Sequence, residues 1–73
     1  MEKIKQLINM MQGHKLSCSM IAYFINLELA KVDKRYKVSK YSVSKWGRWK
    51  KGDPHTTEIK QDAIIKASKR FKI

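Results

Sequence analysis

Residues 39–51 combine cationic, hydroxyl and aromatic side chains at helical spacing. At about 100° per residue, polar and aromatic side chains share one side of a helix, while Val43, Trp46 and the stem of Lys50 share the other. A helix that reads the major groove of DNA needs this division, because the base edges present hydrogen-bond donors and acceptors. The cations among these side chains could bind O6 and N7 of guanine. The residues predicted to face bases are Lys40, Tyr41, Ser44, Lys45 and Arg48.

The positive charge of the chain is concentrated around the same segment. The 73 residues include 17 Lys and Arg against six Asp and Glu, which gives a formal net charge of +11. Residues 31–51 hold nine of the bases and only Asp33 among the acids, a net of +8, with tyrosines and tryptophans between them. Clustered bases with interleaved aromatics are typical of a nucleic-acid surface. The residues predicted to bind phosphate, the last at the amide end of a helix, are Lys34, Arg35, Lys37, Lys50, Lys51 and Ser39.

Two helices are expected ahead of this segment. Residues 2–12 place Ile4, Leu7, Ile8 and Met11 on one face, and Gly13 follows as a C-terminal stop. Ser17 is a good N-cap for the second helix. That helix either continues toward Asp33 or ends near Asn26, a residue type that tolerates a left-handed backbone. The apolar side chains expected to point inward from it are Met20, Ile21, Phe24 and Ile25.

The basic segment itself is expected to hold a connection and a third helix. Residues 34–38 should form a loop, which could include a short strand. Either Ser39 or Ser42 caps the helix, which we expect to run to Lys51, where Gly52-Asp53-Pro54 ends it. Gly47 lies inside this helix and costs about 1 kcal/mol relative to Ala, which implies a packing reason for it. The core aromatic of the helix is either Trp46 or Trp49.

A last helix completes the expected fold. It begins near Thr56 or Thr57 and runs toward Phe71, with a basic tail that suits a helix C-terminus. Its apolar positions, mostly four residues apart, are Ile59, Ala63, Ile64, Ala67 and Phe71. The sequence therefore predicts an all-α fold of four, or at most five, helices in a single domain spanning residues 1–73.

Short motifs in this pattern resemble the helix-turn-helix of small phage repressors of the lambda-repressor/Cro type. Leu16-Ser17 with Ile21-Ala22 resembles the start of that motif, and Ser42-Val43-Ser44-Lys45-Trp46 resembles its recognition helix. Gly52, Pro54 and residues 59–71 resemble the loop and the packing helix that follow. The resemblance implies a sequence-specific regulator of phage or mobile-element type that binds double-stranded DNA and acts as a repressor. Because so small a reading surface gives few contacts, we expect a homodimer on two half-sites one helical turn apart.

The sequence departs from this family in the spacing of the motif. Ala22 and Val43 are separated by 21 positions, roughly ten more than such motifs usually allow. Either the first helix of the motif is extended or residues 28–38 enlarge the turn. Because Trp49-Lys50-Lys51-Gly52 also fits the end of the family's helix, either Trp46 or Trp49 is the core aromatic, and the register of the helix stays open by one turn. The dimer surface is assigned first to the last helix with Phe71-Lys72-Ile73.

Several other classes of function are disfavoured by the composition. His14, His55 and Cys18 lie apart, without metal-ligand spacing, so no metal or cofactor is expected; both histidines should lie at the surface and Cys18 should be a small buried side chain. No nucleophile, base and acid set points to an enzyme or to a small-molecule substrate. The apolar stretch 20–25 is too short for a membrane span, and the start of the chain does not read as a signal peptide. A cytoplasmic location, in a bacterial cell or a phage-infected host, is expected.

Two alternatives to a duplex-binding regulator stay open. A small basic protein could instead dock as an inhibitor or mimic on a partner that handles nucleic acid, and it would then have no affinity for random duplex. An RNA-binding protein would prefer single strands or hairpins and would stack bases on exposed aromatics.

Overall fold

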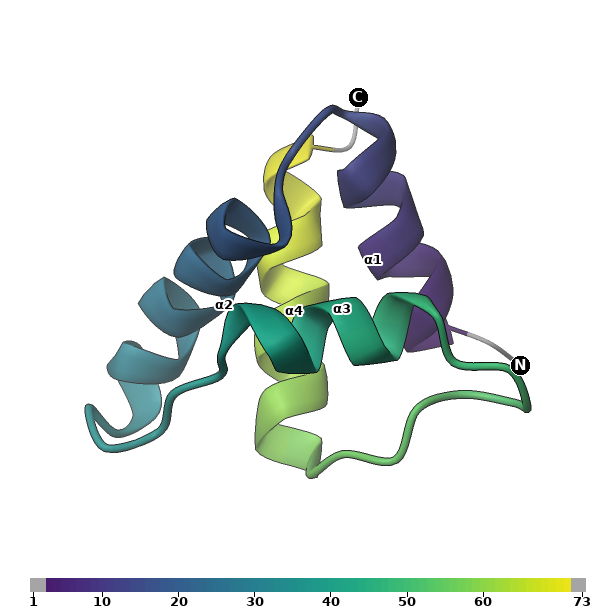
Figure 1. Cartoon of the computed structure of the whole chain (residues 1–73). Coiled ribbons are helices and arrows are strands. Elements are labelled where there is room, and N and C mark those ends of the chain that lie inside the picture. Colours follow the sequence, from purple (N-terminus) through teal and green to yellow (C-terminus); the bar gives the residue numbers. More distant parts are fainter. Residues whose placement is uncertain (1–2, 72–73) are drawn as a thin grey trace.

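The computed structural model describes residues 3–71, and this part of the chain is all-α, as the sequence predicts. Four α-helices follow one another and a short 3₁₀ turn ends the described chain (Figure 1). The expected short strand at residues 34–38 does not form, and that segment is a loop. In chain order the elements are α1 (Lys3–Gly13), α2 (Cys18–Val32), α3 (Lys40–Gly47), α4 (Glu58–Ser68) and the 3₁₀ turn η1 (Lys69–Phe71).

Three helices begin at hydroxyl side chains that cap their first turns. The Ser17 Oγ accepts the amide of Met20 at 3.1 Å at the start of α2. At the start of α3, the Ser39 Oγ accepts the amide of Ser42 at 3.3 Å. At the start of α4, the Thr57 Oγ1 accepts the amide of Lys60 at 3.4 Å. Such caps satisfy amides that the helix itself leaves unpaired and contribute about 1 kcal/mol each. The predicted start at Ser17 is confirmed, and the structure selects Ser39 and Thr57 over their alternatives.

Helix α1 is capped by a residue far away in the sequence. The Asp53 Oδ1 accepts the amides of Ile4 at 2.7 Å and Lys5 at 3.2 Å. A carboxylate at a helix N-terminus is stabilised both by the free amides and by the helix dipole. Asp53 therefore ties the loop after α3 to the start of α1, a role beyond the turn that the sequence predicts there.

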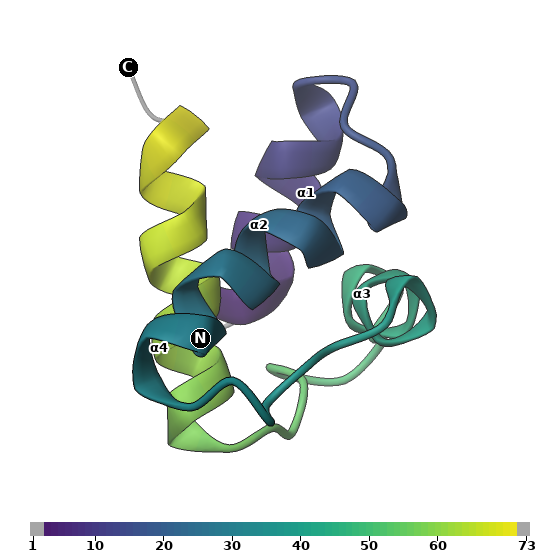
Figure 2. The same ribbon diagram turned by 90° about the vertical axis from the view of Figure 1, so that its left-hand side faces the viewer.

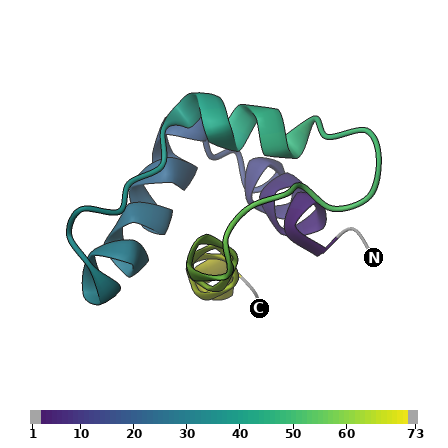
Figure 3. The same cartoon turned by 90° about the horizontal axis from the view of Figure 1, so that it is seen from below.

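The helices enclose one apolar core. Seen from below, α1 and α2 form two sides, α3 spans from one to the other, and α4 lies between them on the other side (Figure 3). Figure 2 shows the same arrangement with α3 nearly end-on and well apart from the upper part of α4. The buried apolar residues come from all four helices and from the loop before α3: Ile4, Ile8, Met11, Ile21, Ala22, Ile25, Leu29, Val38, Val43, Trp46, Ala63, Ile64 and Ala67.

Helix α2 is long, and its inward face differs from the prediction at two positions. It continues through Asn26 to Val32, so the extended alternative is correct. Met20 was expected inward but is 44% exposed, because the buried stripe through Ile21, Ile25 and Leu29 turns position 20 outward. Phe24, also expected inward, is only half-buried.

Helix α3 is shorter than predicted. It ends at Gly47 and not at Lys51, with Arg48 as its C-cap at φ −101° and ψ 8°. The amide of Arg48 bonds to the carbonyls of Lys45 and Ser44, and the Trp49 amide bonds to the Trp46 carbonyl at 3.3 Å, so the last turn tightens. Hydrogen bonds that span three residues, as in a 3₁₀ turn, therefore close the helix four residues before the predicted end at Lys51.

The close approach of α3 to α1 explains the glycine inside α3. A Cβ at Gly47 would lie 3.2 Å from Cγ2 of Ile8 and 3.3 Å from Oε1 of Gln12. The expected packing reason for this glycine is thus confirmed.

Two further expectations differ from the structure. The last helix was expected to run toward Phe71, but α4 ends at Ser68 and the chain continues as the 3₁₀ turn η1. Cys18, expected to be buried, is half-buried near the side chain of Gln12.

Candidate nucleic-acid interface

The outward side of α3 carries four of the five residues predicted to face bases. Val43 is fully buried and Trp46 is 7% exposed, so these two side chains fix the inward side of the helix. Trp46 is therefore the core aromatic, whereas Trp49 is half-buried in the turn after the helix. At about 100° per residue the opposite side carries the exposed Tyr41, Lys45 and Arg48 and the half-buried Ser44. Lys40 is exposed in the first turn but lies on the flank of the helix, nearer to Val43.

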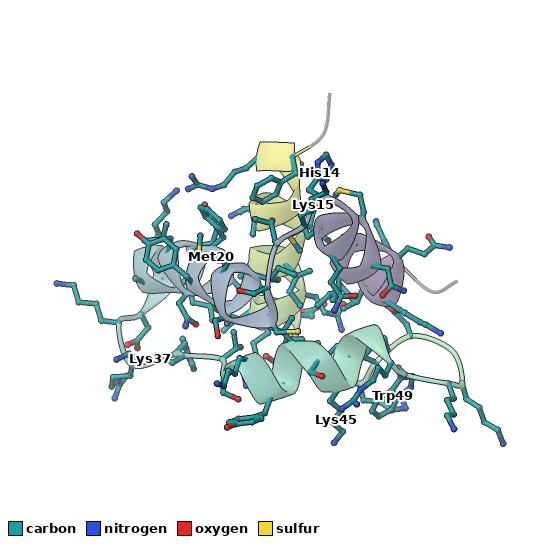
Figure 4. The ribbon with its side chains drawn as sticks, turned by 45° about the horizontal axis from the view of Figure 1, so that its top comes forward. His14, Lys15, Met20, Lys37, Lys45 and Trp49 are labelled. Atoms are coloured by element: carbon teal, nitrogen blue, oxygen red, sulfur yellow. The ribbon has the colours of Figure 1, made fainter. Side chains whose placement is uncertain are left out.

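Aromatic rings hold two of these cations near the helix. The Lys40 Nζ lies 5.4 Å from the centroid of the Tyr41 ring, and the Lys45 Nζ lies 5.7 Å from that of Trp49. Figure 4 shows Lys45 pointing away from the body of the molecule, with Trp49 beyond it at the end of α3. Cation–π contacts of this kind are worth about 0.5–1 kcal/mol at exposed sites. They restrict where the ammonium groups lie without neutralising their charge.

The position of α3 depends on a side chain of α2. Asn26 makes two hydrogen bonds to the backbone of one loop residue: its Nδ2 donates to the Val38 carbonyl at 3.0 Å, and its Oδ1 accepts the Val38 amide at 2.7 Å. Val38 is itself buried, and Ser39 caps α3 directly after it. The Asn26 amide thus fixes the backbone where the chain turns into α3.

The sequence does not predict this role of Asn26; it offers this residue only as one of two possible ends of α2. The available signal was a lone amide among apolar residues between Ile21 and Leu29. A polar side chain facing the protein from such a stretch needs a partner. The sequence does not show which backbone group supplies it.

Two lysines in the connection between α2 and α3 are exposed. Lys34 and Lys37 lie in the loop 33–39, and Figure 4 shows Lys37 on the side of the molecule away from Trp49. Both were predicted to bind phosphate. Among the described residues neither takes part in an ion pair.

Arg35 stands apart from the other predicted phosphate ligands. Its Nη2 lies 2.8 Å from Oδ2 of Asp33, and its Nε donates to Oδ1 at 3.1 Å. The side-chain hydrogen bonds from Arg35, followed by the bond from its backbone amide, hold the pKa of Asp33 below its ordinary value, and the same pair raises the pKa of Arg35. The positive charge of Arg35 is therefore already matched within the protein.

The remaining predicted phosphate ligands lie at the two ends of α3. Ser39 uses its hydroxyl as the cap of α3, so the free groups at this end are the first amides of the helix. Lys50 and Lys51 are exposed in the loop after α3 and not on the helix itself, where they were expected. This loop turns at Gly52, whose φ of +65° suits a residue without a Cβ.

Carboxylates are sparse on the side of the molecule that α3 covers. Asp33 is bound to Arg35, Asp53 caps α1, and Glu28 pairs with Lys31 and Arg70 on α2 and η1. Two further acids of the described chain, Glu58 and Asp62, lie on α4, which packs on the opposite side of α1 and α2 from α3 (Figure 3). The outward side of α3 can therefore attract an anion without competition from a neighbouring carboxylate.

No arrangement for metal binding emerges in residues 3–71. Within this range no three His, Cys, Asp or Glu side chains are placed to hold a metal ion. His14 and His55 are exposed, as predicted, and their rings lie against Phe71 and Trp49 respectively, each at 6.0 Å between centroids. None of the helices in the described range is both long and apolar enough to cross a membrane.

Comparison with known proteins adds no family. The chain matches no protein-family model, no curated protein and no solved structure. What the site can do therefore has to be argued from its own geometry and charge.

Proposed function

We propose that this protein is a sequence-specific regulator that binds double-stranded DNA with α3 in the major groove. The observation that carries the proposal is the two-sidedness of α3. Val43 and Trp46 hold one side in the core, and the other side presents two cations, a hydroxyl and a phenol, with the exposed Lys40 on its flank. A major groove admits one α-helix, and its base edges are read by side chains of these types.

The outward side chains of α3 would divide the contacts with bases among them. Lys40, Lys45 and Arg48 can donate to O6 and N7 of guanine, and Arg48 can do so with two parallel hydrogen bonds. Ser44 can donate to or accept from several bases. Tyr41, 75% exposed, can contact a thymine methyl with its ring or a phosphate with its hydroxyl.

Phosphate contacts would position α3 in the groove from both of its ends. Lys34, Lys37 and the first amides of α3 lie on one side, and Lys50 and Lys51 lie on the other. Such contacts fix the register of a protein on the duplex without reading its sequence. Arg35 would join them only by exchanging its bonds to Asp33 for bonds to a phosphate.

We further propose that the protein acts as a repressor of the lambda-repressor/Cro kind, in which α2, the loop 33–39 and α3 form an enlarged helix-turn-helix. It would occupy an operator as a homodimer, in the cytoplasm of a bacterial cell or a phage-infected host. So short a reading helix makes few contacts, and two half-sites about one helical turn apart would double them.

The salt dependence of binding to duplex DNA tests the electrostatic part of this proposal. Each neutralised phosphate releases counterions, so about six phosphate contacts predict a slope of log K on log salt near −5. The measurement is a gel-shift series in rising salt with a random duplex and with a single strand of equal length. Binding that does not respond to salt, or a preference for the single strand, would remove duplex DNA as the ligand.

One observation favours a second candidate, a docking module for a protein partner. Helix α2 leaves the apolar side chains of Met20, Tyr23 and Leu27 exposed along its outer face. A protein that used this face and not α3 would bind its partner without any affinity for duplex DNA. Substitution of Leu27 by Ser would then abolish its activity, whereas DNA binding through α3 would survive the same change.

A further inference from the structure

A hollow of about 220 Å³ lies between the second half of α2 and α4. It is distinct from the outward side of α3. Two apolar side chains at it are uncovered, Val32 at 61% exposed and Ile59 at 37%. The residues that line the hollow, called here the α2–α4 groove, are Glu28, Val32, Ile59, Asp62, Ala63 and Lys66.

The charges beside the hollow follow an order along α4. Its exposed acids, Glu58 and Asp62, lie in the first half, and the exposed Lys66 follows them. The half-buried Lys60 also lies in the first half, but it does not line the hollow. At about 100° per residue, Ile59, Asp62 and Lys66 share one face of the helix. Among the described residues no ion pair joins Asp62 to Lys66, so both charges are available to a partner.

An acid-first, base-last order matches a second copy of the same helix running in the opposite direction. In a two-fold contact the same patch of each copy faces the other, so residue i meets residue j and j meets i. Two antiparallel α4 helices that cross level with residue 64, midway between positions 62 and 66, therefore bring the carboxylate of each Asp62 to the ammonium of the other Lys66. A parallel arrangement would instead set like charges against each other.

We infer that the α2–α4 groove binds a second copy of this chain through antiparallel α4 helices. Val32 and Ile59 of both copies cover the hollows and supply the affinity, because apolar burial contributes more than an exposed ion pair does. The two Asp62–Lys66 pairs select the antiparallel orientation and this partner.

The proposed contact leaves α3 free. Helix α4 packs on the opposite side of α1 and α2 from α3, so a copy bound to α4 does not cover the residues that face bases (Figure 3). The inference rests on the proposed function only for the use of the dimer, since the contact itself forms without DNA. It keeps the last helix of the sequence-based expectation but not Phe71, whose ring packs against Phe24 at 5.3 Å between centroids. Lys72 and Ile73, which that expectation also included, lie outside the described residues.

Charge exchange between Asp62 and Lys66 tests the inference. Asp62→Lys places lysines at both positions and Lys66→Asp places aspartates at both, so the pairs between copies become like-charged and each variant alone should be monomeric where the natural chain is dimeric. An equal mixture of the two should form a heterodimer, and the double variant D62K/K66D should regain the homodimer. The measurement is analytical ultracentrifugation over a concentration series, with circular dichroism to show that each variant is folded.

A matched control and an apolar variant complete the design. Lys60→Asp changes the charge of α4 by the same amount on a half-buried position away from this face and should leave the dimer intact. Val32→Ser alters a side chain that is already exposed, so the fold should tolerate it. The loss of its apolar contact should raise the dimer dissociation constant about tenfold.

The results separate this inference from the proposed function. A natural chain that stays monomeric, or single variants that dimerise as it does, would overturn the α2–α4 groove as a contact between copies. A mixture of the single variants that stays monomeric would overturn the pairing of Asp62 with Lys66. Binding of one half-site duplex by a monomeric D62K chain would support the role of α3 independently of the dimer. A dimer without affinity for any duplex would contradict the proposed function and leave the contact between copies intact.

Discussion

Arg48 and Lys51 lie three residues apart but in different settings. Arg48 is the C-cap of α3 and is exposed at the end of the helix. Lys51 is exposed in the loop that follows. The first is placed to reach a base edge, and the second is placed to reach a phosphate.

Alanine at these two positions should therefore weaken DNA binding in different ways. Arg48→Ala should cost about 1–3 kcal/mol on the preferred duplex and relax the preference at one base position. Lys51→Ala should weaken binding to all duplexes alike and reduce the salt slope by about one. Competition between the preferred duplex and single-base variants of it measures both effects. Identical profiles for the two variants would refute this division between base and phosphate contacts.

The base-facing residues could be predicted from the sequence because their placement is a matter of helical periodicity. Once Val43 and Trp46 are inward, the opposite side of α3 follows at about 100° per residue. Arg35 shows the limit of such reasoning. Its charge counts toward a basic segment, but only the structure shows that its guanidinium is bound to Asp33.

At the scale of the element, the starts of the helices were predictable and the contacts that orient the helices were not. Ser17, Ser39 and Thr57 cap the turns that directly follow them, so their roles depend on local sequence. The Asp53 cap of α1 and the Asn26 clamp on Val38 join residues 49 and 12 positions apart. No local pattern specifies such pairs, because they arise only when the helices pack.

Asn26→Ala should lower both stability and DNA affinity. The substitution leaves the amide and the carbonyl of Val38 without partners, which costs about 1–3 kcal/mol in the free energy of unfolding. DNA affinity should fall as well, because the backbone ahead of α3 loses its attachment to α2. Urea unfolding and a gel shift measure the two quantities.

Asn9→Ala is the matched control for this change. Asn9 is exposed on α1, and its replacement should alter stability by no more than about 0.5 kcal/mol. If the Asn26 and Asn9 variants unfold at the same urea concentration and bind DNA equally, the clamp does not position α3.

At the scale of the whole molecule, a buried carboxylate on α2 joins this helix to η1, the last element of the described chain. Glu28 on α2 is 8% exposed and lies 3.2 Å from Arg70 of η1 and 3.3 Å from Lys31. Burial raises the pKa of Glu28, but the hydrogen bonds and charges of Arg70 and Lys31 outweigh burial, so its pKa lies below the ordinary value of 4.5. The unfolded chain therefore binds a proton on Glu28 more readily than the folded protein does.

This difference predicts a loss of stability in acid. The contribution of Glu28 is fully present above its unfolded pKa and is lost as the pH falls through its lower pKa in the folded protein. In Glu28→Gln that part of the pH dependence should vanish, so the unfolding midpoint should change less between about pH 5 and pH 3. Asp33→Asn serves as a comparison for this pH dependence. Because the ion pair of Asp33 with Arg35 is more exposed than that of Glu28, its loss should change the unfolding midpoint in acid less. A Glu28→Gln variant that loses stability in acid as steeply as the natural chain would contradict the assignment.

The molecule as a whole separates a cationic side built on α3 from a side built on α4 that carries Glu58 and Asp62. Selection of bound sequences from a pool of random duplexes is the most direct test of what the α3 side does. We expect the natural chain to enrich one recurring site with two related halves, and the Arg48→Ala variant to lose that enrichment. Bound sequences that do not differ from the starting pool, although the protein binds duplex DNA, would contradict reading of bases by α3.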